Sequence, residues 1–222
     1  MNQSLLWLRR GCVMAILLLA GAGCDPASLS YFLFRGDQRA PAEAKAFEPK
    51  KDKREVVVAV LVNSPVGSLE FAGLDRDITS AMVRMFDEQT KDKKPHVTVV
   101  NQTKLDRYKA SHPSWRSMNA ADIGKELGAE YTLEMTITAF NLYEPGTGRN
   151  MYMGQSSATV VVHETATGDE FAQYFVDAPL ESKPADSMPA GQYKTELVKK
   201  LALRTSWKHI PHVTDQRISG VQ

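Results

Sequence analysis

Cys24 is the residue whose position most clearly suggests chemistry. The 222-residue chain has one other cysteine, Cys12, which lies beside the apolar run Val13–Ala20. If the chain is cleaved just before Cys24, the mature protein keeps a single thiol and has no internal disulfide to form. A thioether to a lipid would account for that thiol. The cysteine count therefore predicts lipid attachment at Cys24.

The residues before Cys24 have the order of an export signal. Arg9 and Arg10 form a basic head, residues 13–20 are all apolar, and residues 21–23 are small. This order is typical of a secretory signal peptide. The apolar run is also far shorter than the roughly 20 residues that a membrane-spanning helix needs. We expect residues 1–23 to be a signal peptide.

The end of this signal resembles a bacterial lipobox in residues 19–24, which read LAGAGC, with Gly21 where that motif commonly has Leu. The resemblance implies signal cleavage between Gly23 and Cys24 and acylation of the Cys24 sulfur, with palmitate among the acyl chains. Two alternatives remain open. The A-x-A pattern at Ala20-Gly21-Ala22 also fits plain signal cleavage, and the segment could stay uncleaved as an anchor.

The histidines do not form a recognisable metal site. His209 and His212 have close ligand spacing, but Pro211 forbids a regular helix there and no third ligand is near in sequence. We interpret both as part of a solvent-exposed tail after the last helix. His163, followed by Glu164, is expected to form a surface pair at a strand end. The sequence thus predicts neither a metal nor a cofactor.

No catalytic motif is found in the sequence. It has no G-x-S-x-G nucleophile elbow, no G-x-G-x-x-G fingerprint and no Walker loop. Asp75 and Asp77 are carboxylates two residues apart, and the first turn of a helix, where negative charge is favoured, accounts for them. With Cys24 acylated, no cysteine nucleophile remains. We expect no catalytic residue and no enzyme activity.

Charge and hydropathy exclude two further classes of protein. The mean hydropathy of −0.31 excludes a polytopic membrane protein. Removal of residues 1–23 takes away two arginines and no acidic residue, so the net charge moves from +1 to about −1. A nucleic-acid-binding protein would need a clustered basic face, and the two lysine-rich runs, at 50–54 and 91–94, are both interrupted by aspartate. We expect no nucleic-acid partner.

The stretch from Cys24 to residue 54 is predicted to be a flexible tether. It holds three prolines, several alanines and a charge run, with no helical or alternating period. A flexible chain of this length reaches about 30 Å, from roughly 5–6 Å times the square root of the residue number. Lipid at Cys24 would bind the bilayer, and the tether would set the distance of the following domain from it.

Residues 55–207 are predicted to form one α/β domain, followed by a C-terminal tail at 208–222. The β-branched run Val56–Val62 suits a strand buried on both faces. Residues 131–140 alternate between the two faces of a half-buried strand. With the two strands that follow, they are expected to form an antiparallel meander flanked by helices. The expected class is a single domain with a mixed β-sheet, a three-stranded antiparallel meander and flanking helices. The predicted strands are 56–62, 97–100, 131–140, 151–163 and 170–176, and the predicted helices are 74–89, 104–110, 119–128 and 192–207.

This order resembles bacterial envelope lipoproteins of the CsgG/LpoB-like group, which serve curli export and penicillin-binding-protein activation. The matching pieces are the first strand at 56–61, the helix-to-strand passage Ala121–Tyr131, and the strand-turn-strand at Thr159–Phe171, which contains Thr167-Gly168-Asp169. Glu134 stands where the group usually has glycine. The resemblance implies a periplasm-facing, non-catalytic accessory protein with an envelope protein as partner.

Three hypotheses of function follow. The first is a lipid-anchored binding module in cell-envelope assembly or export, in either the inner or the outer membrane. The second is a ring-forming secretion component, since the curli-type members form rings, and an oligomer is compatible with the sequence. The third is a periplasmic enzyme whose site is assembled from dispersed residues. No extra pair of alternating strands suits a bilayer-spanning hairpin, which argues against a pore.

Overall fold

The computed structural model describes residues 39–47, 55–64, 72–91 and 95–213. Nearly all of these residues belong to one compact unit, Pro41–His212. A second unit comprises residues 1–40 and 213–222, and only its innermost residues are described. The short strands β1 (Arg39–Ala40) and β8 (His212–Val213) lie at the two ends of the described chain.

A mixed sheet organises the larger unit, in the strand order β3-β2-β4-β5-β6. Strand β2 pairs in parallel with both β3 and β4, whereas β4, β5 and β6 form an antiparallel meander, and the short β7 pairs with β5. The predicted α/β class and the three-stranded meander are therefore confirmed. The strands are β2 (Glu55–Asn63), β3 (His96–Val99), β4 (Tyr131–Tyr143), β5 (Met151–Glu164), β6 (Glu170–Asp177) and β7 (Lys183–Pro184).

Strand β2 is apolar from Val56 to Val62 because helices cover it on both faces. Val58, Val60 and Val62 belong to the larger core, and Ala59 and Leu61 belong to the smaller core on the opposite face. All five are buried. A strand covered on two sides loses the polar alternation of a half-exposed strand. This double coverage explains the continuous β-branched run in the sequence.

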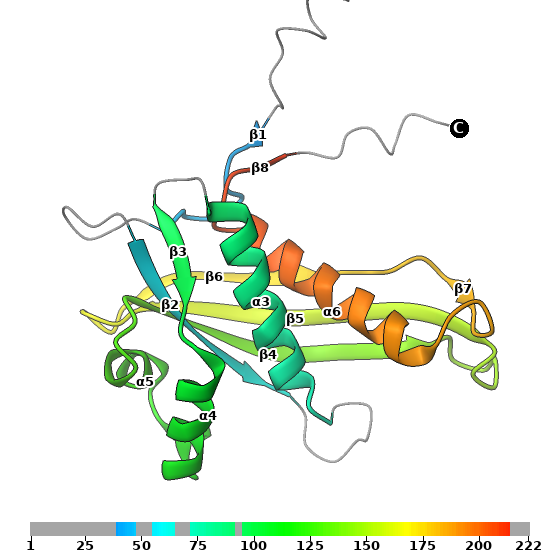
Figure 1. The fold of residues 1–222 in the computed structure, drawn as a ribbon, viewed down its shortest axis with the longest axis horizontal. Coiled ribbons are helices and arrows are strands. Elements are labelled where there is room, and N and C mark those ends of the chain that lie inside the picture. The colour runs from blue at the N-terminus through cyan, green and yellow to red at the C-terminus, as the bar shows by residue number, and fades with distance from the viewer. Residues whose placement is uncertain (1–38, 48–54, 65–71, 92–94, 214–222) are drawn as a thin grey trace, which may run out of the picture. The chain divides into compact units, whose positions relative to one another are not determined.

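Two long helices cover one face of the sheet. Helix α3 (Leu74–Thr90) and helix α6 (Ala190–Trp207) lie side by side across the strands (Figure 1). Their buried side chains recur at three- and four-residue spacing, which places them on one stripe of each helix. These side chains are Ile78, Ala81, Met82 and Phe86 in α3, and Tyr193, Leu197, Val198 and Leu201 in α6.

Shorter helices cover the other face where it lies over β2. Helix α4 (Gln102–Ser111), the 3₁₀ turn Trp115–Ser117 and helix α5 (Ala120–Glu126) enclose the smaller core. The side chain of Asn119 caps α5 by accepting a bond from the backbone N–H of Ala121 at 2.8 Å. Gly128, at φ +72°, ends this passage in the left-handed region.

The domain extends beyond both predicted limits. Phe47, which falls in the predicted tether, is only 3% exposed and belongs to the larger core. The backbone N–H of Ala44 donates to Lys208 O at 2.7 Å. The expectation of an exposed tail beginning at residue 208 is wrong for its first residues, because His209 and Ile210 are 2% and 3% exposed. Burial of the Phe47 and His209 rings and of the Ile210 side chain holds both segments against the rest of the domain.

Among the described helices, none combines the length and the hydropathy needed to cross a membrane.

Candidate functional site

The predicted lipid-attachment site lies outside the described residues. Cys24, Gly23 and the proposed cleavage between them precede residue 39, where the description begins. The described residues belong to the domain that a lipid at Cys24 would anchor.

The two carboxylates at the start of α3 have the structural role that the sequence predicts. Asp75 and Asp77 both lie in its first turn. Asp75 Oδ2 lies 3.6 Å from Lys109 Nζ of α4, and Asp77 Oδ2 lies 3.0 Å from Lys194 Nζ of α6. Each carboxylate thus links α3 to a neighbouring helix. Burial lowers the pKa of Lys109, and the nearby carboxylates act against that shift.

His163 pairs with Glu134 across neighbouring strands. Its Nε2 lies 3.7 Å from Glu134 Oε2, and the amide of Asn63 donates to Glu134 Oε1 at 3.0 Å. Three strands thus contribute one polar side chain each, a juxtaposition that only the pairing of β2, β4 and β5 reveals. The sequence predicts a surface pair of His163 with the adjacent Glu164, whereas the structure pairs His163 with Glu134 of β4. Within the described residues, no group of three or more His, Cys, Asp or Glu could hold a metal ion.

His209 belongs to a buried aromatic cluster rather than to a metal site. Its ring stacks on Phe47, with centroids 4.3 Å apart, and its Nε2 lies 2.7 Å from the Tyr174 hydroxyl. Burial lowers the pKa of His209 to about 4 and raises the pKa of Tyr174. Both groups are therefore neutral at neutral pH, as a structural pair would be.

A cleft of about 750 Å³ runs along β3 at the edge of the sheet. Apolar side chains from several elements line it: Val57 of β2, Val83 of α3, Val99 of β3, and Leu127, which follows α5. Volumes of a few hundred Å³ with mainly apolar linings are usual for binding sites. This cleft is the best candidate for a binding site in the described residues.

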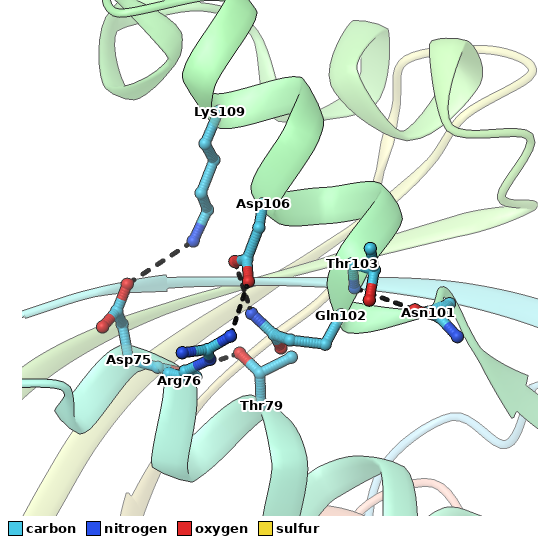
Figure 2. Close-up of polar contacts among 8 residues, drawn as sticks. All are labelled: Asp75, Arg76, Thr79, Asn101, Gln102, Thr103, Asp106 and Lys109. Carbon is cyan, nitrogen blue, oxygen red and sulfur yellow. Dashed lines mark hydrogen bonds and ion pairs between the residues drawn. The ribbon is translucent and has the colours of Figure 1, made fainter.

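Contacts between α3 and α4 hold the two helices that flank this cleft (Figure 2). Arg76 Nη2 of α3 lies 3.4 Å from Asp106 Oδ2 of α4, and within α4 Gln102 donates from Nε2 to Asp106 Oδ1 at 2.7 Å. Figure 2 also shows Lys109 reaching from α4 to Asp75 of α3. These contacts tie α4, which follows directly after β3, to α3.

The charged side chains of the cleft are both cationic. Lys104 donates from Nζ to Leu127 O at 2.8 Å, and Arg84 is exposed on α3. Among the described residues that line the cleft, none is a carboxylate or a histidine. This lining suits binding of an anionic group.

The sequence does not reveal this cleft. It predicts a strand at 97–100, but the edge position of that strand depends on parallel pairing with β2. The four-residue β3 carries no signal of its place in the sheet order. Lys104 and Arg84 are 20 residues apart in the chain, and they line the same cleft only because α3 and α4 pack beside β3.

No known family model matches the chain, and no curated protein matches it in sequence. Several solved structures resemble the backbone. Lipoprotein GNA1162 from Neisseria meningitidis is 10% identical, covering 65% of this chain and 93% of that one at a TM-score of 0.42. The PelC dodecamer protein from Paraburkholderia phytofirmans is 13% identical, covering 75% and 95% at 0.41.

The LpoB C-terminal domain from Salmonella enterica is also found, at 14% identity and a TM-score of 0.38, over 56% of this chain and 83% of that one.

Proposed function

We propose that this chain is a bacterial lipoprotein, anchored to a membrane through acylated Cys24, that acts as a non-catalytic binding module in the cell envelope. Signal cleavage between Gly23 and Cys24 would leave the lipid-bearing cysteine as the first residue. The domain would face the periplasm at the end of the tether and would bind another envelope protein in assembly or export.

The observation that carries this proposal is the order of residues 9–24. A basic pair, an apolar run and small residues precede the one cysteine that a mature chain would keep. Two acyl chains or more would make the attachment stable, since each buried CH₂ contributes about 0.8 kcal/mol and a single chain binds only marginally. The lining of the β3 cleft, which is apolar and cationic, supports binding rather than catalysis as the role of the domain.

Cell fractionation with a matched variant tests the proposal. The wild-type chain should sediment with membranes and incorporate radiolabelled palmitate, and Cys24→Ala should do neither. Cys12→Ala is the control, since a change inside the cleaved signal should leave both results as in the wild type. Palmitate incorporation that persists in Cys24→Ala would contradict the proposed attachment site.

A further inference from the structure

We propose that the cleft beside β3 binds an extended, acid-rich peptide segment of a partner protein, which adds as a strand to the edge of the sheet. This inference rests on the proposed function only in taking the domain to be a binding module. It names where the partner binds and what chemistry that partner presents.

The backbone of β3 faces the cleft at Val99. The N–H of Val100 donates to Val58 O at 2.9 Å, on the side of β2. Backbone groups of successive strand residues point to opposite edges, so the N–H and C=O of Val99 point away from β2. Two residues earlier on the same edge, the N–H of Val97 donates to Thr90 Oγ1 at 3.0 Å, so this N–H is not available to an added strand. The edge therefore opens at Val99, and Val99 lines the cleft.

Side chains over both faces of the sheet flank this edge. Val83 and Arg84 of α3 lie toward one face of the sheet, and Val57, Lys104 and Leu127 lie toward the other. Figure 1 shows β3 running beside α3 and leading into α4. Side chains of an added strand would point alternately to the two faces. Each face would then offer such a strand an apolar contact and one cation.

The charges decide which peptide fits. Arg84 has no ion-pair partner among the described residues, and the charge of Lys104 is held at the wall by its bond to Leu127 O. One turn further along α3, Asp87 faces His96, with 3.8 Å between Oδ1 and Nε2. Carboxylates on the added strand would complement the two cations, whereas lysines there would be repelled. The favoured segment therefore presents an acidic and a β-branched apolar residue to each face, as the order Glu-Glu-Val-Val does, because alternate residues of a strand share a face.

An anionic amphiphile, such as a fatty acid, could use the same apolar walls and cations. It would leave the backbone groups of Val99 unused, because an acyl chain has neither donors nor acceptors along its length. Dependence on the peptide backbone therefore separates the two ligands. Strand addition at a sheet edge gains its affinity from main-chain hydrogen bonds and its selectivity from side-chain pockets.

Fluorescence anisotropy on the full-length protein in phosphatidylcholine nanodiscs tests the inference. The probe is a fluorescein-labelled octapeptide that repeats the order Glu-Glu-Val-Val, which puts glutamate and valine on both faces of an added strand. We expect saturable binding, with affinity reduced about tenfold when lysine replaces glutamate, a loss of about 1.4 kcal/mol. N-methylation of two successive central residues removes a backbone donor on each edge of the peptide, and it should weaken binding by a similar factor.

Variants of the protein locate the site. Arg84→Glu should weaken binding of the glutamate-valine peptide about tenfold. Arg107→Glu, a matched change at an exposed arginine of α4 that does not line the cleft, should leave it unchanged. Ser80→Trp, which fills the cleft from α3, should abolish binding. Unfolding midpoints of all three variants show whether each is folded.

Three results would overturn the inference. The first is an absence of peptide binding up to about 1 mM. The second is equal binding of the lysine and glutamate peptides, or of the N-methylated peptide. The third is binding of laurate that Arg84→Glu weakens while the peptide does not bind, which would make the cleft an amphiphile site. Each outcome leaves the Cys24 fractionation result untouched, so failure here is distinguishable from failure of the proposed anchoring.

Discussion

His209 Nε2 lies 2.7 Å from the hydroxyl oxygen of Tyr174, while His209 Nδ1 lies 2.8 Å from the carbonyl oxygen of Lys45. The carbonyl can only accept, so Nδ1 carries the proton, and the Nε2 lone pair accepts from the Tyr174 hydroxyl. A neutral imidazole satisfies both contacts. This arrangement holds the segment before β2 to the segment after α6.

Acid should therefore destabilise the domain through His209. Its pKa is about 4 in the folded protein, against an ordinary value of 6.5. Between these values the unfolded chain binds more protons, so the free energy of unfolding falls as the pH drops from 6.5 to 4. The full loss is about 3 kcal/mol, at roughly 1.4 kcal/mol per pKa unit. Urea unfolding of the purified protein at a series of pH values measures it.

His209→Gln serves as the control for this pH dependence. Glutamine does not titrate, so the component assigned to His209 should vanish while stability at pH 7.5 falls through lost stacking on Phe47. If His209→Gln shows the same loss between pH 6.5 and 4 as the wild type, another group causes it.

Tyr174→Phe isolates the hydrogen bond. It should lower the free energy of unfolding at neutral pH by about 1–3 kcal/mol, because it leaves the buried Nε2 without its donor. The ring stays, so the aromatic contacts are kept. An unchanged urea midpoint would show that water replaces the hydroxyl.

Phe47 should be essential to the stability of the domain. It contacts the rings of Phe86, Tyr131 and Phe171, with centroids 6.1, 5.1 and 6.1 Å away. Phe47→Ala should cost about 3–5 kcal/mol, as expected for removal of a buried aromatic ring. A chain beginning at residue 48 should unfold at lower urea than one beginning at residue 39. Equal midpoints would mean that this segment contributes nothing to the core.

Gly124 should not tolerate a side chain. A Cβ on Gly124 would overlap the Thr132 hydroxyl and lie 2.7 Å from Thr165 Cγ2. Gly124→Ala should lower the free energy of unfolding by about 1–3 kcal/mol, since overpacking outweighs the gain in helix propensity. Gly191→Ala is the matched control in a helix, because nothing lies within 4 Å of its Cβ position. It should be neutral or stabilising by up to about 1 kcal/mol.

A stable Gly124→Ala protein would contradict the close packing of α5 on β4. Thermal unfolding of both glycine variants, compared at the same pH and salt, provides the measurement.

Local pattern was sufficient to predict most elements of this fold. The unbroken run at 56–62 predicts a strand covered on two faces, and the structure places it between the two cores. The alternation from Tyr131 predicts a half-buried strand, and β4 begins there. Asn119 and Gly128 mark the two ends of the α5 passage in both sequence and structure. Each of these signals depends on neighbours close in the chain.

The features that escaped prediction depend on contacts between distant residues. Phe47 and His209 are 162 positions apart, and nothing near either one shows that their rings stack. A proline-rich segment and a short stretch after a helix both resemble exposed chain when considered alone. The β3 cleft likewise depends on strand order, which a four-residue strand cannot specify.

The most direct test of the account is mass spectrometry of the N-terminal peptide from protein purified out of native membranes. Lipid attachment predicts a peptide that begins at Cys24 and carries the mass of two or three acyl chains. A peptide that begins at Cys24 with an unmodified thiol, or one that begins at any other residue, would contradict the proposed anchor.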